Sequence, residues 1–376
     1  MNHQTISPLL PPSTTELHTG SNLFHNETVP KLLTKWGHRA VIITDPIVAE
    51  LYGIHLSQKW QTDLIVVPTI GESAKTREVK AWLEDQLLAK RYGRDTVLLA
   101  LGGGSITDLV GFVASTYLRG VPLFLLPTTL LAIVDAAIGG KTGIDTQHGK
   151  NLLGSYYPPK VIIADLNTLE SLPLQEWQNG LAEILKAALI ADSALWTLCN
   201  NVWRSKLEQI APHAIQVKID TIEQDPLEKG LRRILNFGHT VGHALEAVAC
   251  YQIAHGEAVA IGLMAESYLS MRMGLLDSNS LEEIFARISS SGFLLQLPGN
   301  YDRINFLSAM AYDKKIARGV LRFTLIEKIG KAVSFNGEYC CPVPHELVLD
   351  MIDWMENSLQ KNSILLKNSC RLTSPQ

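Results

Sequence analysis

The 376-residue sequence has few cysteines and no CxxC pair, which leaves it without a zinc-ribbon or dithiol signature. An odd number of cysteines, five in all, is also a poor disulfide framework. Basic residues are not in excess, and the formal net charge of -4 disfavours a generic nucleic-acid or anionic-membrane partner. The N-terminus has no basic segment followed by an apolar run, so no signal peptide is expected. These absences favour a reduced, cytoplasmic protein.

A long uninterrupted apolar run is also missing. Residues 121–140 come nearest, but Pro122, Pro127 and Asp135 interrupt them. A carboxylate and a broken helix are costly in lipid, so we expect a buried strand, turn and helix here and no membrane partner. The overall balance of 46% hydrophobic and 19% charged residues is typical of a globular chain with a sizeable core.

The first half of the chain alternates short apolar runs with an amphipathic segment. The runs are rich in Val, Ile and Leu without polar alternation, as expected for strands that are buried on both faces of a parallel sheet. Strands are therefore predicted at 40–44, 63–67, 96–101, 121–126 and 161–164, with a helix at 75–91. Strands that alternate with helices indicate an α/β domain.

The second half has helical periodicity and few strand signals. We predict helices at 178–191, 205–223, 239–249, 256–273, 279–290 and 344–359, with one β-like stretch at 320–326. The change in pattern places a domain boundary near residue 174. The prediction is an α/β domain over residues 1–174 and a mostly helical domain over residues 175–376.

A glycine-rich turn follows the strand at 96–101. Gly102, Gly103 and Gly104 are followed by Ser105-Ile106-Thr107-Asp108 and then by an apolar run typical of a helix. Glycines at this place allow close approach to a pyrophosphate, which the next helix N-terminus can bind. The usual GxGxxG fingerprint is absent, so a simple tight turn is the alternative. Thr128 and Thr129 follow the next strand at the same edge of the sheet and support the phosphate interpretation.

The helical half contains histidines at a spacing suited to a metal. His239 and His243 lie four residues apart, on one face of a helix, and His255 begins another helix. Glu183, in the apolar segment GLAEILKAALI, is the best candidate for a carboxylate ligand, because such a position rarely carries an unpartnered charge. Spacing alone does not choose between His239 and His243, and an ion pair of Glu183 with Lys186 is the alternative to a metal site.

Longer blocks resemble the 3-dehydroquinate synthase family over about residues 40–335. They include GESAK, GGGSITD, GFVASTYLRG, PTTLLAIVDAAIGGKTGID, GKNLLG, GLAEILK, LRRILNFGHTVGHALE, HGEAVAIGL and DKK. The resemblance implies an N-terminal NAD-binding α/β domain with a Rossmann-like parallel sheet, an all-α C-terminal metal-binding domain, and an active site in the cleft between the two.

The resemblance also implies roles for individual residues. The metal ligands, for Zn²⁺ or Co²⁺, would be Glu183, His239 and His255. Substrate-phosphate positions would be Lys141, Asn236, His243 and one of Lys314 or Lys315. Positions around the sugar hydroxyls and carboxylate would be Asp135, Asn151, Lys186, Lys218 and Arg232. NAD positions would be Asp45, Glu72, Lys75, Gly103, Gly104, Asp108, Thr128, Thr129, Leu131, Lys141 and Lys150. Arg119 matches an arginine that reaches the neighbouring subunit's substrate, which implies a homodimer.

Departures from the family pattern concern the cofactor positions. Ile47 stands where an Asn is usual, and Ser105 and Thr107 stand where Val and Gly are common. The expected weakness is in NAD affinity, since none of the three matches a residue of the chemistry.

The implied activity is conversion of 3-deoxy-arabino-heptulosonate 7-phosphate to 3-dehydroquinate and phosphate, a step of the shikimate pathway. Three other functions stay open. A metal-dependent polyol or glycerol-type dehydrogenase would use the same glycine turn but would not need Lys141, Arg232 or Asn236. A different sugar phosphate cyclase would not need a carboxylate-binding set at Lys218 and Arg232. A non-catalytic metal- or NAD-binding protein is disfavoured by the complete set of metal ligands.

Overall fold

The computed structural model describes residues 14–36, 39–312 and 321–361, and the chain divides into two compact units, Met1–Ser171 and Leu172–Gln376. Within the described ranges, no helix is both long and apolar enough to cross a membrane. The stretch 121–140 instead forms a buried strand followed by a short irregular helix, as predicted.

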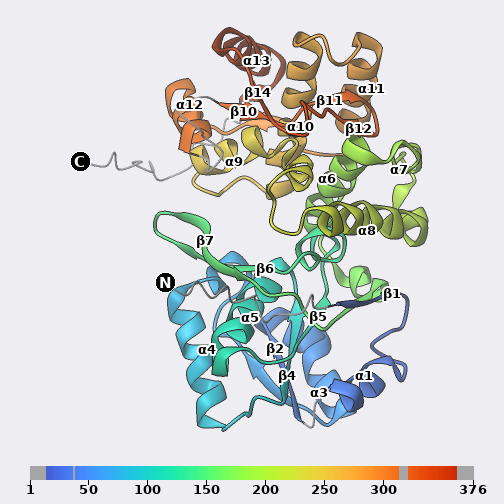
Figure 1. The fold of residues 1–376 in the computed structure, drawn as a ribbon, viewed down its shortest axis with the longest axis vertical. Coiled ribbons are helices and arrows are strands. Elements are labelled where there is room, and N and C mark those ends of the chain that lie inside the picture. The colour runs from blue at the N-terminus through green and yellow to red at the C-terminus, as the bar shows by residue number, and fades with distance from the viewer. Residues whose placement is uncertain (1–13, 37–38, 313–320, 362–376) are drawn as a thin grey trace, which may run out of the picture. The chain divides into compact units, whose positions relative to one another are not determined.

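The first unit is built on a six-stranded sheet with the strand order β1-β8-β5-β4-β2-β3 (Figure 1). Every pairing in this sheet is parallel. The strands are β1 (Glu16–Gly20), β2 (Arg39–Thr44), β3 (Asp63–Val66), β4 (Thr96–Gly102), β5 (Leu123–Pro127) and β8 (Val161–Asp165). Every residue of β4, β5 and β8 is buried, which explains their continuous apolar sequence.

Helices pack on both faces of this sheet (Figure 1). On one face, side chains of α1 (Thr28–Trp36) and α3 (Ile54–Trp60) pack on Ile42, Leu99 and Phe124 of the strands. The other face is covered by α5 (Gly104–Thr116), which lies beside α4 (Arg77–Ala89). The α/β fold class predicted for this part of the chain is confirmed.

An antiparallel hairpin follows β5 along the chain. It pairs β6 (Lys141–Thr146) with β7 (Gly149–Tyr156), and much of β7 is exposed. The carbonyl of Thr142 would lie 1.9 Å from a Cβ atom at Gly154, so only glycine allows the two strands to meet there. Neither β1 nor this hairpin was among the predicted strands.

The second unit is mostly helical, as predicted. Its helices are α6 (Leu174–Ala191), α7 (Ser193–Leu198), α8 (Leu207–Gln224), α9 (His239–Val248), α10 (His255–Arg272), α11 (Ser278–Ser290), α12 (Arg303–Tyr312) and α13 (His345–Ser358). The β-like stretch at 320–326 contributes the short strands β10 (Arg322–Phe323) and β11 (Ile326–Lys328). Four further short strands complete two-stranded pairs, namely β9 (Gln296–Leu297), β12 (Lys331–Ala332), β13 (Cys341–Pro342) and β14 (Gln360–Lys361).

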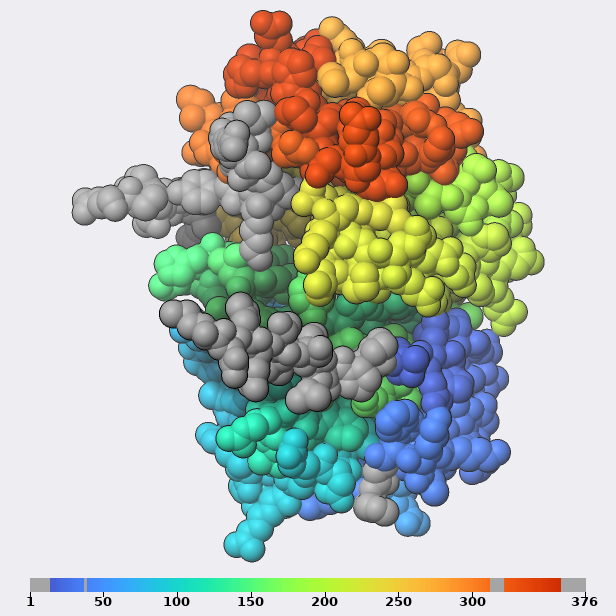
Figure 2. Space-filling model, in the orientation of Figure 1, coloured from blue at the N-terminus to red at the C-terminus, as the bar shows by residue number. Residues whose placement is uncertain are grey.

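One hydrophobic core holds this unit together. It gathers Val241 and Leu245 of α9, Ile261 of α10, Phe323 of β10 and Met351 of α13, all fully buried. Figure 2 shows the same association from outside, with residues of the 321–361 segment (red) lying against those around α9 (yellow). Helices α9 and α10 are therefore fixed by packing on several sides, which matters because both begin with a histidine.

Candidate functional site

Three side chains of the second unit converge as a ligand set for a cation. Glu183 lies within α6, while His239 and His255 are the first residues of α9 and α10. One oxygen of Glu183, Oε1, is 3.3 Å from Nε2 of His239 and 3.1 Å from Nε2 of His255. One ligand atom from each residue lies within 4.8 Å of the others, so the set predicted from the sequence can hold a metal ion.

The hydrogen bonds of the two imidazoles suit metal binding. Nδ1 of His239 lies 3.2 Å from the carbonyl oxygen of Phe237, and Nδ1 of His255 lies 3.5 Å from Oε1 of the buried Glu246. With acceptors at both Nδ1 atoms, each ring can keep a proton there when a cation replaces the contact between its Nε2 atom and Glu183. One carboxylate and two Nε2 atoms form a donor set that fits Zn²⁺ or Co²⁺.

The electrostatics of the metal-free set are those of a buried ion cluster. Burial would raise the pKa of Glu183, but the Lys186 ammonium, which contacts its Oε2 atom, and His239 hold the pKa well below its ordinary value. Burial lowers the pKa of His239 to about 4. Burial would do the same to His255, but its contacts with Glu183 and Glu246 raise its pKa to about 10. A negative carboxylate is thus available to a cation at neutral pH.

His243 does not join this ligand set, although it lies one turn after His239. Its ring centroid is 5.1 Å from that of His239, in an edge-to-face arrangement, and its side chain is exposed. The structure therefore places His239, and not His243, with Glu183 and His255.

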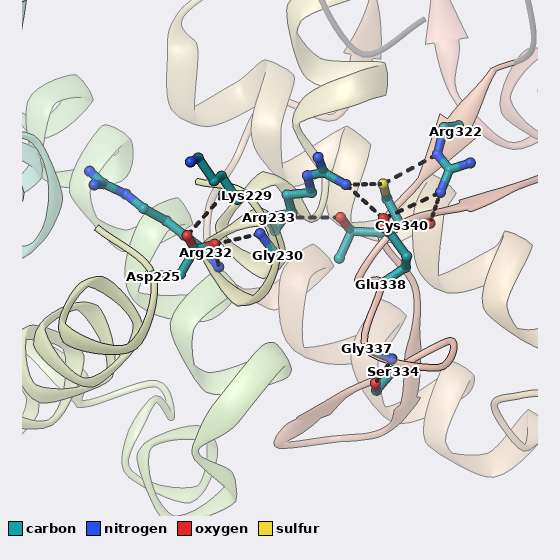
Figure 3. Close-up of polar contacts among 11 residues, drawn as sticks. Asp225, Lys229, Gly230, Arg232, Arg233, Arg322, Ser334, Gly337, Glu338 and Cys340 are labelled. Atoms are coloured by element: carbon teal, nitrogen blue, oxygen red, sulfur yellow. Dashed lines mark hydrogen bonds and ion pairs between the residues drawn. The ribbon is translucent and has the colours of Figure 1, made fainter. Parts of the chain in front are cut away.

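A short 3₁₀ segment, η7 (Leu231–Asn236), carries two more of the predicted site residues, Arg232 and Asn236. The start of η7 is fixed by Asp225, whose carboxylate accepts the backbone N–H groups of Lys229, Gly230 and Arg232 at 2.9, 2.6 and 3.0 Å (Figure 3). These bonds, working against burial, lower the pKa of Asp225, so it is ionised at neutral pH.

The two site residues of η7 are held differently. Arg232 is 2% exposed, and its guanidinium donates to the carbonyl of Pro226 at 2.6 Å. Asn236 is half-buried and donates through Nδ2 to Oε1 of Glu228 at 2.9 Å. Both groups can present donors to an anionic ligand.

The same segment is fixed on a second side by Arg233. Its guanidinium donates to Oε2 of Glu338 at 2.7 Å and lies 3.8 Å from Sγ of Cys340 (Figure 3). Arg322 contacts the same sulfur at 3.4 Å and donates to the Cys340 carbonyl at 2.6 Å. Thus Asp225 fixes the backbone up to Arg232 through N–H bonds, and the Arg233–Glu338 ion pair fixes the next residue, which limits the movement of η7.

A cavity of about 430 Å³ lies elsewhere in this unit. Its walls come from the end of α6, from α8, from η7 and from the β12 region. None of the predicted site residues lines it, so its position does not mark the cation site. Lys218, half-buried on α8, is likewise not among its lining residues.

The glycine turn in the first unit has the form expected of a phosphate loop. β4 ends at Gly102, Gly103 is the N-cap, and α5 begins at Gly104. A Cβ atom at Gly103 would lie 3.0 Å from the Thr129 side chain, and Thr128 donates its N–H to the Gly102 carbonyl at 3.0 Å. The first N–H groups of a helix have no partner within it, so this turn fits a pyrophosphate.

A buried lysine joins several predicted residues next to this turn. Nζ of Lys75, 3% exposed, donates to Asp108 at 3.0 Å and to Asn151 at 2.6 Å, and lies 3.5 Å from Glu72. Burial raises the pKa of Asp108 to about 6, although the Lys75 ammonium opposes this rise. Burial would lower the pKa of Lys75, but Asp108 and Glu72 raise it, so it stays charged.

Departures from the family pattern are also visible here. Ser105 donates its hydroxyl to Glu72 at 2.8 Å, and Thr107 donates to the Gly104 carbonyl at 3.0 Å. Asp45 caps the short helix α2 (Pro46–Val48) by accepting the N–H groups of Ile47 and Val48. The side chain of Ile47 is 53% exposed. The Ser105 hydroxyl therefore bonds to the neighbouring segment Gly71–Ala74, and the Thr107 hydroxyl bonds within α5.

The remaining predicted residues of the first unit lie in the β6–β7 hairpin and in the segments on either side of β5. Lys141 begins β6, Asn151 and Lys150 lie on β7, and Asp135 lies in the irregular helix Ala132–Ala136, which follows Leu131. Arg119 is exposed and has a left-handed φ of 67°. The predicted Lys314 and Lys315 lie outside the described residues.

Sequence reasoning missed the residues that hold these groups in place. Glu246 contacts His255, Asp225 binds the backbone before Arg232, and Glu266 binds the backbone around His239. The only signal in the sequence was a carboxylate within an otherwise apolar helix, which applies to Glu266 as it did to Glu183.

Comparison with solved structures defines the class to which this fold belongs. The chain is 29% identical to 2-epi-5-epi-valiolone synthase from Streptomyces hygroscopicus with NAD⁺ and Zn²⁺ bound, with a TM-score of 0.84 over 94% of this chain and 99% of that one. It is 25% identical to a 2-deoxy-scyllo-inosose synthase complexed with carbaglucose-6-phosphate, NAD⁺ and Co²⁺, with a TM-score of 0.82 over 91% and 96%. The fold is that of the sugar phosphate cyclases.

Sequence comparison then gives the family. Residues 65–179 match the 3-dehydroquinate synthase N-terminal model and residues 180–316 match the C-terminal model. A 3-dehydroquinate synthase of Legionella pneumophila (strain Lens) is 40% identical over 314 residues, 80% of this chain and 85% of the relative. That of Coxiella burnetii is 39% identical over 329 residues, 84% and 91%. The chain belongs to the 3-dehydroquinate synthase family.

Proposed function

We propose that the protein converts 3-deoxy-D-arabino-heptulosonate 7-phosphate to 3-dehydroquinate and phosphate, as a carbon–oxygen lyase that depends on NAD⁺ and a divalent metal. The observation that carries the proposal is the convergence of Glu183, His239 and His255 in a chain of this family. The reaction consists of transient oxidation of a secondary hydroxyl, loss of phosphate, return of the hydride and aldol closure of the ring.

Two bound groups are needed for this chemistry. When bound, NAD⁺ accepts and returns the hydride, and Zn²⁺ or Co²⁺ acidifies the reacting hydroxyl. Glu183, His239 and His255 would hold the metal. The glycine turn at Gly103 and Gly104, with Thr128 and Thr129, would hold the pyrophosphate. The remaining cofactor positions would be Asp45, Glu72, Lys75, Asp108, Leu131, Lys141 and Lys150.

The chain's own side chains would bind the anionic ends of the substrate and orient it. Arg232 and Lys218 would bind the carboxylate, and Asn236, His243 and Lys141 the phosphate, with Lys314 or Lys315. Asp135, Asn151 and Lys186 would lie around the sugar hydroxyls. The departing phosphate itself would take the proton, which explains why no separate carboxylate base is assigned.

A mixing experiment tests the proposal. Purified protein, Zn²⁺, a trace of NAD⁺ and the heptulosonate 7-phosphate are combined, and free phosphate and reduced nicotinamide are followed together. Because the hydride leaves and returns in one turnover, we expect phosphate far in excess of the NAD⁺ present, no accumulating NADH, and a carbocyclic product.

Two other outcomes would replace the proposal. NADH that accumulates in step with substrate consumed indicates a polyol-type dehydrogenase. No turnover of this substrate together with turnover of another phosphorylated sugar indicates a different cyclase.

We further propose a cytoplasmic homodimer in which Arg119 of each subunit reaches the substrate of the other. The left-handed backbone at Leu118 and Arg119 supports a special role, because this conformation costs a non-glycine residue of order 1–3 kcal/mol. Arg119→Ala and Asn236→Ala subunits should each be inactive alone. Mixed after partial unfolding, they should regain activity, since one site of the mixed dimer is then intact. No recovery in a proven mixed dimer would place Arg119 in its own subunit's site.

A further inference from the structure

A fully buried carboxylate, that of Glu266, binds the beginning of helix α9 from the neighbouring helix α10. Its Oε2 atom accepts the N–H of Gly238 at 2.8 Å, and its Oε1 atom accepts those of Thr240 and Val241 at 3.1 and 3.3 Å. Glu266 has no exposed surface, and three backbone donors converge on it. A buried carboxylate retained in an apolar helix needs such partners to be tolerated.

This arrangement replaces an ordinary helix cap. The first N–H groups of a helix lack intrahelical partners, and the preceding residue normally supplies a side-chain oxygen. In α9 that residue is Gly238, which has no side chain and a left-handed φ of 80°. The cap therefore comes from Glu266, whose negative charge also suits the positive end of the α9 dipole.

The position of the bond matters because His239 lies between the bound residues. Gly238 precedes it and Thr240 follows it, so one carboxylate fixes the backbone on both sides of this histidine. The imidazole is then oriented by its contact with the Phe237 carbonyl at 3.2 Å. The exposed His243 follows one turn later on the same helix, so its backbone position is fixed together with that of His239.

Helices α9 and α10 can approach closely enough for the Glu266 carboxylate to reach the α9 backbone only because α10 has a glycine, Gly262, at the crossing. A Cβ atom at Gly262 would lie 1.9 Å from the carbonyl oxygen of Gly238. Gly262 precedes Glu266 by one turn of α10, so the bare surface at Gly262 allows the carboxylate to reach the α9 backbone. Gly262 and Glu266 together determine where α9 begins relative to α10 and how closely the two helices approach.

We propose that Glu266 is a positioning residue. By binding the start of α9, it holds His239 where its imidazole can bind the cation, and it fixes His243 one turn further along the same helix. This proposal rests on the proposed cation site. It assigns Glu266 no contact with substrate or cofactor. Residues behind metal ligands typically change metal affinity by about 10–100-fold when they are replaced.

The test compares Glu266→Gln with Ser270→Ala, a matched control. Ser270 lies one turn further along α10 and is fully buried, and its side-chain hydrogen bonds join it to the Glu266 carbonyl and the Ile326 N–H rather than to the α9 backbone. Two readouts are used without substrate: Co²⁺ affinity with the visible spectrum of the Co²⁺ protein, and ¹⁵N-histidine NMR spectra of the metal-free protein.

We expect Glu266→Gln to weaken Co²⁺ binding about 10–100-fold, to alter the Co²⁺ spectrum and to shift the ring signals of His239 and His243. Ser270→Ala should lose stability but keep the wild-type affinity and spectra. Glu266→Asp, which keeps the charge with a shorter reach, should recover part of the affinity and is measured in place of Glu266→Gln if that variant does not fold.

The proposal is overturned if Glu266→Gln, or its replacement, loses stability as Ser270→Ala does while Co²⁺ affinity and histidine spectra stay as in the wild type. If the wild type itself binds no Co²⁺, the proposed cation site fails. The metal-free histidine spectra then still decide whether Glu266 positions His239.

Discussion

The two histidines of α9 have different surroundings although they share one helix face. His239 is 11% exposed at its side chain and lies 3.3 Å from Glu183, whereas His243 is exposed and lies outside the ligand set. The spacing of four residues predicted a shared face, but it carries no information about which ring the carboxylate of another helix would reach. That choice depends on where α6 packs.

Alanine substitutions separate the roles of these histidines. Glu183→Ala, His239→Ala and His255→Ala should each remove bound metal and activity together, because a three-ligand site loses one donor. His243→Ala should lose activity but keep its metal. Metal content per subunit after gel filtration measures this. A metal-free His243→Ala beside a metal-loaded His239→Ala would reverse the assignment.

The ion pair of the buried Lys75 with the partly buried Asp108 predicts a pH effect in the first unit. Asp108 has an ordinary pKa of 3.8 and a pKa of about 6 in the folded protein. Because the folded pKa is the higher one, the stability linked to this carboxyl is fully present below pH 3.8 and is lost as the pH rises through about 6.

Lys75→Met should raise the pKa of Asp108 further, since the ammonium that favours the carboxylate is removed. Carboxyl titration by ¹³C NMR in cofactor-free protein measures the midpoint. Lys35→Met removes an exposed lysine that pairs with Glu16 and should leave the Asp108 midpoint unchanged. A midpoint that falls in Lys75→Met would show that the Lys75 ammonium does not lower the pKa of Asp108.

At the scale of elements, the crossing of α9 and α10 is the feature that assembles the cation site. Gly262→Ala would place a methyl group 1.9 Å from the Gly238 carbonyl oxygen, so the helices must separate. We expect a loss of about 1–3 kcal/mol in unfolding free energy, as for other overpacked sites, together with weaker metal binding. Denaturant unfolding and Zn²⁺ titration measure the two effects.

Gly104→Ala is the control for this substitution. Its methyl group would meet the Ala136 side chain at 3.4 Å, an ordinary contact, and it lies in the α/β unit. It should leave metal binding unchanged. Equal metal affinity in Gly262→Ala and the wild type would show that the helix crossing does not set the ligand positions.

Most elements could be predicted from the sequence because their apolar patterns are strong. The buried strands β2, β4, β5 and β8, and the long helices of the second unit, agree with the predicted ranges within a few residues. β1 was missed because its residues, Glu-Leu-His-Thr-Gly, are only half-buried at the sheet edge. The β6–β7 hairpin was missed because β7 is largely exposed and its pairing depends on glycine at position 154.

The residues that hold the site could not be predicted in the same way. Asp225, Glu246 and Glu266 act through contacts with residues whose place depends on the finished fold, such as the N–H groups of Gly238 and Thr240. Local sequence gives no sign of those partners. Residue type and spacing gave the candidate ligands, but spacing left His239 and His243 open, and the full set came from the resemblance to the family.

At the scale of the whole molecule, the two proposed cofactor sites draw on separate parts of the chain. The proposed NAD residues lie between Asp45 and Lys150, in the first unit, whereas the metal ligands lie between Glu183 and His255, in the second. The two groups can therefore stabilise different regions. Each unit has its own hydrophobic core.

Hydrogen exchange should show this separation directly. Zn²⁺ alone should slow amide exchange at the starts of α9 and α10, and NAD⁺ alone should slow it around Gly102–Asp108, because a ligand protects the structure it binds. At one hundred times its dissociation constant, each should add about 2.7 kcal/mol of stability. Protection by Zn²⁺ confined to residues 14–171 would contradict the metal assignment.

The contact between Lys186 and Glu183 should allow the protein to fold in the cell without its metal ion. The lysine lies on the same helix as the carboxylate, so the negative charge has a partner as soon as α6 forms, before any metal ion arrives. Synthesis and folding then do not have to wait for the metal supply. We expect scarcity of the ion to leave a folded, though less stable, reserve of the protein that can be loaded when the ion returns.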